Sequence, residues 1–288
     1  VTVCETGSMT AAASQLFIAQ PSISLAISEM EEYYGVKLFD RISRKLYLTE
    51  NGRRALQYAR HIIDLLDEME QGVRDVDAMG RLKVGTSITI GTYLLPGYIK
   101  RLKQQYPALK VEASIANSET IEQQILDNEI DVGIIEGVAH SHFILSESFA
   151  GDRLAFICPA GHEFAGRTLE ELAEVRNQDF ILREKGSAGR EIFDGILAAQ
   201  ELNVRPIWQS ASNQVILQGV KAGLGISILP YFLVRQDIWE GELAEFRIKG
   251  LALNRKYSVI YHKNKFLPRS ARTLMELCKE ENGTARGL

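Results

Sequence analysis

Residues 8–52 carry residue types at spacings that suit nucleic-acid binding, beginning with a pair of predicted helices. Ser8 is placed to cap the first helix by accepting hydrogen bonds from its free N–H groups. The alanines at 11–13 let a second helix approach closely. Pro21 stands in the first turn of that second helix, where its missing N–H costs nothing. These residues predict two short helices joined by a tight turn.

The second helix combines an apolar face with faces that carry amide and hydroxyl groups. Ile23, Ile27 and Met30 recur at helical spacing and predict the buried face. The other faces carry Gln20, Ser22, Ser24 and Ser28. Such side chains can hydrogen-bond base edges and phosphates. The pattern is typical of a helix-turn-helix, whose second helix enters the major groove of DNA.

A basic stretch follows these helices. Residues 37–54 hold six basic residues and two acidic ones, in a chain of net charge −4. Arg44-Lys45 lies between two apolar segments, which predicts a two-stranded wing with a basic tip. The alternative is a solvated charged face, but the position directly after a helix-turn-helix favours phosphate contacts. Such contacts supply affinity that depends on salt.

These segments resemble the LysR-type transcriptional regulators over essentially the whole chain, most strongly over residues 3–60. The matching residues are Ala11, Ala12, Leu16, Gln20, Pro21, Ser22, Ser24, Glu31, Gly35, Leu38, Phe39, Arg41, Leu48, Thr49 and Gly52. Similar proteins begin with about one further helical stretch before Val3, so the first helix is expected to lack its start. Many members place Arg-Gln where this chain has Leu25-Ala26, so that base contact is absent. The predicted contacts to double-stranded DNA are Thr10, Gln20, Pro21, Ser22, Ser24, Ser28, Arg41, Arg44 and Lys45.

Residues 53–79 predict a linker helix that pairs two chains. Thr49 can cap it, and apolar residues then recur alternately every three and four positions, as in a heptad seam. The seam residues are Ala59, Ile62, Leu66, Met69, Val73 and Val76. The alternative is an amphipathic helix packed on its own domain. The family resemblance implies a homodimer or homotetramer reading two half-sites, with RNA polymerase as a further partner.

The family resemblance implies that residues 81–288 form an α/β effector domain of two lobes with a ligand cleft between them, like the periplasmic binding proteins. This domain follows the N-terminal all-α winged helix-turn-helix of residues 1–52. Alternating elements imply mostly parallel sheets. The Pro159–Gly161 break is expected to separate lobe I (81–159 and 263–288) from lobe II (160–262), and residues 168–171 read as a capping box. Strands are expected at 82–86, 110–115, 132–135, 144–147, 154–158, 180–182, 205–209, 226–229, 243–247 and 257–261, and helices at 93–105, 119–127, 190–199, 214–222 and 269–281.

Polar residues at four expected helix N-termini are candidates for an effector site in the cleft between these lobes. They are Ser87, Thr89, Asn117, Ser118, Ser187, Ser212 and Asn213. Free N–H groups and the helix dipole bind anions there, and Arg183 and Arg190 can add charge for a carboxylate or oxyanion. Each residue taken singly can equally be a helix cap. Arg183 can instead pair with Glu184 or Glu191.

Three segments resemble a branch of the family linked to sulfur and cysteine metabolism. They are residues 86–96, 182–187 and 223–229. This likeness suggests a small oxyanion or a sulfur metabolite as the effector.

Composition and missing motifs narrow the function further. No apolar run is long enough to span a membrane, and three scattered cysteines predict neither disulfides nor zinc, so a cytoplasmic protein is expected. His140-Ser-His142 lacks further metal ligands at a recognisable spacing. No common catalytic or nucleotide-binding motif occurs. We therefore expect a regulator without enzymatic activity, cofactor or metal; the alternative is a solute-binding protein or enzyme of the two-lobed fold.

Overall fold

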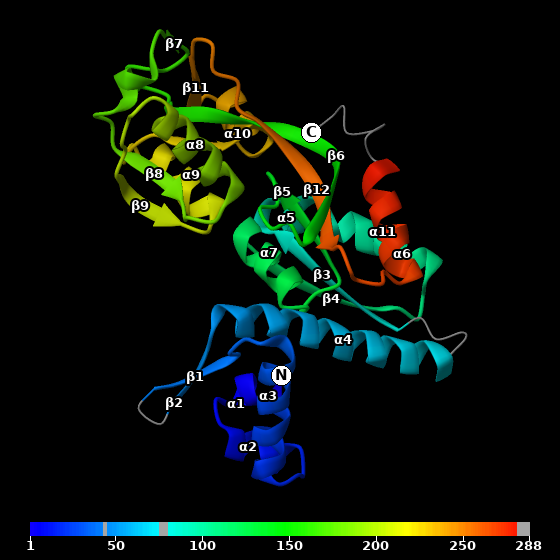
Figure 1. Cartoon of the computed structure of the whole chain (residues 1–288). Coiled ribbons are helices and arrows are strands. Elements are labelled where there is room, and N and C mark those ends of the chain that lie inside the picture. The colour runs from blue at the N-terminus through cyan, green and yellow to red at the C-terminus, as the bar shows by residue number, and fades with distance from the viewer. Residues whose placement is uncertain (43–44, 75–79, 281–288) are drawn as a thin grey trace. The chain divides into compact units, whose positions relative to one another are not determined.

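The computed structural model describes residues 1–42, 45–74 and 80–280. The chain divides into two compact units, one of Val1–Ala78 with Asn264–Phe266 and one of Met79–Lys263 with Leu267–Leu288 (Figure 1). Among the described residues, none of the helices combines the length and the apolar character that crossing a bilayer requires.

The first unit begins with three helices, α1 (Thr2–Thr6), α2 (Met9–Gln15) and α3 (Gln20–Tyr34). The Ser8 hydroxyl caps α2 by accepting from the Ala11 N–H at 3.3 Å, and Pro21 stands in the first turn of α3, both as predicted. Ala12, Ala13 and Ile23 are buried together, because alanines let α2 and α3 approach closely. The predicted helix-turn-helix is therefore formed by α2 and α3.

A two-stranded antiparallel wing and a long helix complete this unit. The wing pairs β1 (Phe39–Ile42) with β2 (Lys45–Leu48), and α4 runs over Glu50–Arg74. The Thr49 hydroxyl caps α4 by accepting from the Gly52 N–H at 2.9 Å. A Cβ on Gly52 would lie 2.1 Å from the Leu38 carbonyl oxygen, so only glycine fits where α4 leaves the wing.

The first lobe of the second unit is built on three parallel strands. They are β3 (Arg81–Ser87), β4 (Lys110–Ala116) and β5 (Val132–Glu136), with β3 in the centre. The helices of this lobe are α5 (Ile88–Tyr93), α6 (Leu95–Gln105), α7 (Ser118–Leu126) and α11 (Arg269–Glu280). As expected, the final helix returns to this lobe, because its apolar face packs into the same core as β3 and α6.

The second lobe holds the elements between the two long strands. They are β7 (Thr168–Leu169), a 3₁₀ turn (Leu172–Val175), β8 (Phe180–Arg183), α8 (Ala188–Ala199), β9 (Pro206–Ser210), α9 (Asn213–Lys221), β10 (Ser227–Pro230), α10 (Tyr231–Trp239) and β11 (Leu243–Ile248). Two buried apolar clusters fill this lobe, one of them built around Phe156, Phe180, Phe193 and Phe246.

Two long strands join the lobes, which differs from the expected connection. β6 (Ile144–Pro159) is one strand where two were predicted, and it pairs antiparallel with β12 (Asn254–His262) (Figure 1). The chain enters the second lobe inside β6, since Leu154 already packs in the second lobe's core, rather than at Pro159. The sheet is mixed rather than mostly parallel. β12 is also antiparallel to β5, and β6 is antiparallel to both β10 and β11.

Two further local predictions differ from the structure. The helix expected at 93–105 is two helices that meet at Leu94, where Pro96 restarts the chain as α6. The capping box lies at Glu171 and Glu174, not at 168–171, because Thr168 pairs in β7. The predicted end of the linker helix near residue 79 lies outside the described residues. Helix α10 was not predicted.

Candidate functional site

The predicted DNA-contacting residues of the helix-turn-helix lie mostly on its exposed side. Thr10 on α2 is exposed, as are Gln20, Pro21, Ser22 and Ser28 on α3, while Ser24 is half-buried. Ile23 faces the core, but Met30, which we expected to be buried, is 43% exposed because it lines an open apolar pocket against α4. The helix therefore presents amide and hydroxyl groups of the kind that read base edges.

The wing is formed, although its basic tip is only partly described. Arg41 belongs to β1 and Lys45 begins β2, whereas Arg44 lies outside the described residues. Glu31 ties α3 to the start of the wing, because its carboxylate accepts from the N–H groups of Leu38 at 2.9 Å and Phe39 at 3.2 Å. These bonds, with the Lys37 ammonium, hold the pKa of Glu31 below its usual value against the opposing effect of burial.

The predicted seam of α4 is an apolar surface on the single chain. Ile62 is 64% exposed, Leu66 52% and Met69 56%, while Ala59 is half-buried. Val73 lies in α4 with its side chain undescribed, and Val76 lies outside the described residues. Exposed apolar residues in a row of this kind mark an interaction surface.

Six of the predicted effector residues line one small cavity between the two lobes. They are Ser87, Asn117, Ser118, Arg183, Ser187 and Asn213. The cavity has a volume of about 20 Å³, which is room for about one water molecule. Thr89 is buried beside the cavity without lining it, and Ser212 lines an adjoining pocket of about 500 Å³.

Three of these polar residues cap helices, which was the alternative interpretation. Asn117 caps α7 by accepting from the Thr120 N–H, Ser187 caps α8 and Ser212 caps α9. Ser118 is different, since its hydroxyl donates to the Glu136 carbonyl oxygen at 3.1 Å. Capping still leaves N–H groups at the helix N-termini without an acceptor in the helix. A capping role and a ligand-binding role are thus compatible here.

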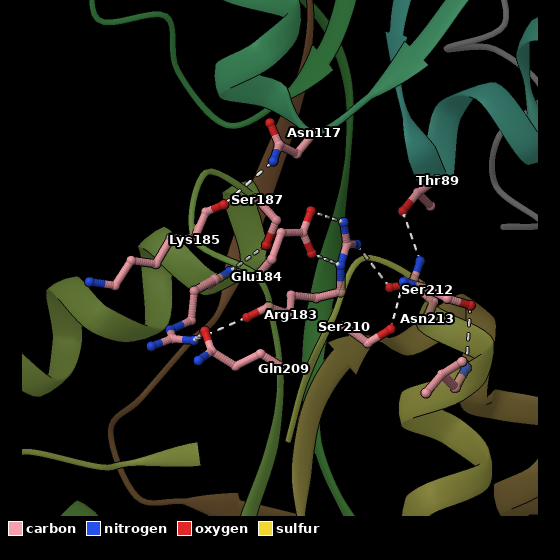
Figure 2. A network of polar contacts seen from close by, with 12 residues as sticks. Thr89, Asn117, Arg183, Glu184, Lys185, Ser187, Gln209, Ser210, Ser212 and Asn213 are labelled. Atoms are coloured by element: carbon pink, nitrogen blue, oxygen red, sulfur yellow. Dashed lines mark hydrogen bonds and ion pairs between the residues drawn. The ribbon is translucent and has the colours of Figure 1, made fainter. Parts of the chain in front are cut away.

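Hydrogen bonds from these same residues join the two lobes. The Asn117 side-chain amide donates to the Lys185 carbonyl oxygen at 3.4 Å, and the Asn213 amide donates to the Thr89 hydroxyl at 3.4 Å (Figure 2). The backbone N–H of Glu119 also donates to the Gly186 carbonyl oxygen at 3.1 Å. The cavity is small because the lobes are in contact along its rim.

The two arginines expected to add charge already have carboxylate partners. Arg183 donates to both oxygens of Glu184, at 2.9 and 3.0 Å, and to the Asn213 side chain at 2.9 Å (Figure 2). Arg190 donates to Asp194 at 2.8 Å and does not line the cavity. Of the pairings we considered for Arg183, the one with Glu184 is formed.

The floor of the cavity carries charged residues that were not predicted. Arg255 on β12 donates to both oxygens of Asp152, at 2.8 and 2.5 Å, and its Nη1 lies 3.9 Å from Oε1 of Glu136. Burial by itself lowers the pKa of Arg255. The carboxylates of Asp152 and Glu136 raise this pKa by more than burial lowers it, so it lies above the ordinary value for arginine. Glu136 ends a fully buried strand, which is a sequence signal for a cleft residue, whereas nothing near Arg255 in the sequence marked it.

One further contact between lobes involves a histidine that had been considered as a metal ligand. His140 contacts Glu191 of α8 at 2.6 Å and Glu122 of α7 at 3.3 Å. These carboxylates raise the pKa of His140 above its ordinary value. Among the described residues, Asp237, Glu240 and Glu242 could together hold a metal ion, but the Lys221 ammonium already bonds Asp237 and Glu242.

The two units match two family models. Residues 1–53 match the bacterial regulatory helix-turn-helix of the lysR family, and residues 77–283 match the LysR substrate binding domain. The chain belongs to the LysR family of transcriptional regulators. Its second unit is accordingly an effector-binding domain. The DNA-binding unit sets it apart from a solute-binding protein of the two-lobed fold.

Relatives along nearly the whole length support this assignment. The uncharacterized HTH-type transcriptional regulator YeiE of Escherichia coli is 34% identical over 97% of this chain and 94% of its own. The regulator CysL of Bacillus subtilis is 30% identical over 91% of this chain and 88% of its own. The regulatory domain of CcmR from Synechocystis, solved in complex with 2-PG, has a TM-score of 0.64 at 24% identity, over 73% of this chain and 99% of that one.

Proposed function

We propose that this protein is an effector-responsive regulator in which ligand binding between the two lobes changes how α3 binds DNA. The observation that carries the proposal is the convergence of the N-termini of α7, α8 and α9 on one cavity between lobes. Three N-termini supply free N–H groups and positive dipole ends to a single point. A ligand that contacts both lobes changes the arrangement of the lobes only if it binds one arrangement more tightly than another.

The proposed DNA contacts are the exposed polar residues of α2 and α3 together with the wing. Gln20 and Ser22, at the start of α3, are placed to read base edges, with Thr10, Pro21, Ser24 and Ser28 beside them. Arg41, Arg44 and Lys45 of the wing are proposed to contact phosphates, which makes the affinity salt-dependent. These assignments rest on the exposure of the helix residues and on the basic composition of the wing.

We further propose that the chain works as a homodimer or homotetramer paired through α4. The exposed Ile62, Leu66 and Met69 are supported in this role by their heptad spacing. Two copies of α3 would then read two half-sites of one operator. RNA polymerase as a partner and a cytoplasmic location follow from the same role, and the relatives named as regulators support a function without catalysis.

The effector of this proposal is a small molecule with an anionic group. Ser87, Thr89, Asn117, Ser118, Arg183, Ser187, Ser212 and Asn213 are proposed to hold it or to shape its cavity. The CcmR domain solved with 2-PG supports a small-molecule ligand in such a domain. The resemblance of residues 86–96, 182–187 and 223–229 to the sulfur- and cysteine-metabolism branch of the family suggests a sulfur-containing compound.

The test is a footprint of the full-length protein on the DNA upstream of its own gene and the divergent neighbour. Sulfate, thiosulfate, sulfite and O-acetylserine are added in turn. A protected region whose length changes with one of these compounds supports the proposal and gives the effector class. A protected region that stays the same with all four compounds contradicts a sulfur-containing effector. A protein that protects no DNA contradicts the proposal that it is a DNA-binding regulator.

Replacing Ser87 and Thr89 by alanine should weaken the response to the effector without changing DNA affinity in its absence. If DNA affinity without effector fell instead, the assignment of these residues to the effector site would be wrong. Gel-shift titrations with and without the responsive compound distinguish the two results.

A further inference from the structure

Two buried polar atoms that face the small cavity lack a hydrogen-bond partner. They are Oγ of Ser87, at the end of β3, and Oε1 of Glu136, at the end of β5. Ser87 is 2% exposed and Glu136 3%. Ser87 precedes α5 but does not cap it, so its hydroxyl is not used by the helix. Buried polar groups are nearly always paired, so two unpaired atoms on one cavity wall indicate a missing ligand group.

The charges around the cavity say what that group must be. Its two lining arginines already have partners, since Arg255 binds both oxygens of Asp152 and Arg183 binds both oxygens of Glu184. Glu136 is left over, because its Oε1 lies 3.9 Å from Arg255, beyond hydrogen-bond distance. The group that fits Glu136 and Ser87 is therefore a positively charged donor such as an ammonium, rather than a further anion.

The helix N-termini at the cavity favour a negative group. Ser118 begins α7, and Ala188 and Gly189 begin α8, and all three line the cavity. The first N–H groups of a helix have no acceptor within it and bind carboxylates well. One cavity thus offers N–H donors together with a carboxylate oxygen that has no hydrogen-bond partner.

A larger pocket of about 500 Å³ adjoins this cavity. The two share Ile88, Asn213 and Leu229, and the larger one is also lined by Tyr93 and Leu233. The small cavity has room for about one water molecule, so a ligand with two charged groups enters it only if the lobes part along the hydrogen bonds at its rim. Its side chain can then extend into the larger pocket.

We propose that the effector is a small zwitterion, an α-amino acid or a derivative that keeps its free ammonium and acidic groups. The ammonium donates to Glu136 and Ser87, and the acidic group accepts from the N–H groups at the starts of α7 and α8. This inference rests on the proposed function, which requires an effector between the lobes, and goes beyond it by naming the effector's chemical class.

The test is isothermal titration calorimetry of the full-length protein with the twenty amino acids, O-acetylserine, sulfate and thiosulfate. Every amino compound that binds is then compared with its N-acetyl form, which lacks the ammonium, and with its amide, which lacks the carboxylate. At least one zwitterion should bind, and each modification should weaken it about tenfold or more, because a charge-assisted bond is lost.

Glu136→Gln keeps the shape of the side chain and removes its charge. It should weaken the zwitterion about tenfold or more, while sulfate binding stays the same or strengthens. The matched control is Glu129→Gln, the same change at an exposed site in the same lobe, which should bind like the parent protein. Thermal unfolding and DNA binding without effector establish that each variant is folded. Should Glu136→Gln not fold, Ser87→Ala replaces it, with an expected severalfold loss.

Three results would overturn the inference. One is an N-acetyl form that binds as tightly as its parent compound. Another is Glu136→Gln in folded form with undiminished affinity for the zwitterion. The third is binding by sulfate or thiosulfate with none by any zwitterion. If that anion also changes the DNA footprint, the proposed function stands and only the zwitterion is wrong, whereas a protein without DNA binding contradicts the proposed function itself.

Discussion

The helix-turn-helix and the small cavity between the lobes use polar side chains in opposite ways. On α3, Gln20 and Ser22 are exposed and are available to an external partner. In the cavity, Ser187, Arg183 and Arg255 are largely buried and are bonded to neighbouring protein groups. A surface that reads DNA can be changed without disturbing its fold. A cavity built from mutual contacts cannot, so its binding and stability should change together.

The largest test of this difference is Arg255→Ala. It removes the cation that hydrogen-bonds both oxygens of the buried Asp152, and removing one partner of a buried pair costs about 3–5 kcal/mol. The loss in free energy of unfolding is measured by urea denaturation of the full chain, followed through a signal from the second unit. Arg247→Ala is the control, since Arg247 is exposed and its loss should cost less than about 1 kcal/mol. A loss below about 1 kcal/mol for Arg255→Ala would contradict the comparison.

Gln20→Ala should do the reverse. Losing one good base contact costs about 1–3 kcal/mol of binding, or about 5- to 150-fold in operator affinity, while the free energy of unfolding stays the same. The slope of affinity against salt should also stay unchanged, because Gln carries no charge. Gln104→Ala serves as the control, because Gln104 is an exposed glutamine on α6. Gel shifts over a salt series read out both quantities. Equal losses of affinity and stability would erase the distinction between the regions.

A pair of serine variants sharpens the comparison at a smaller scale. Ser187→Ala removes the cap of α8, which accepts from the Arg190 N–H at 3.3 Å, and should cost about 1 kcal/mol. Ser22→Ala on exposed α3 should stay within about 0.5 kcal/mol. Chemical denaturation measures both. If both variants lost a similar free energy of unfolding, burial and capping would not distinguish the cavity from α3.

The smallest effect concerns pH and the contact of His140 with both lobes. Hydrogen bonds to Glu191 and Glu122 raise the pKa of His140 in the folded protein above its ordinary value near 6.5. The contact therefore stabilises fully below that ordinary value and is lost as pH rises through the raised pKa. His140→Gln should destabilise the protein more at pH 6 than at pH 9, by less than about 1 kcal/mol because the pair is exposed. A larger loss of stability at pH 9 than at pH 6 would contradict this sign.

Local signals predicted more of the fold than long-range pairing did. Ser8, Pro21 and Thr49 stand where capping and helix-start rules place them, because those rules depend on a few neighbouring residues. By contrast, β6 was divided in two, since the interruption around Gly151 reads as a loop until β12 is known to pair beside it. The antiparallel joining of the lobes has no local signature, because it depends on strands far apart in the chain.

The cavity was predicted in part for a similar reason. Asn117, Ser187 and Asn213 were found because each stands at a helix start, which the sequence marks. Arg255 lies in the middle of a polar stretch and became a cavity residue only through its pairing with Asp152. Glu136 was passed over although it ends a buried strand, because an acidic residue there looks like the beginning of a loop.

The sequence by itself determined the helix-turn-helix, its wing, the family and the helix starts that face the effector cavity. These features depend on short-range spacing, hydrophobic periodicity and capping, all of which are written within a few turns of chain. Only the tertiary structure decided that β6 and β12 carry the chain between lobes and that Glu136 is left unpaired beside Ser87. The physical reason is that burial and pairing of charge depend on which distant segments meet, and that is settled only when the sheet is assembled.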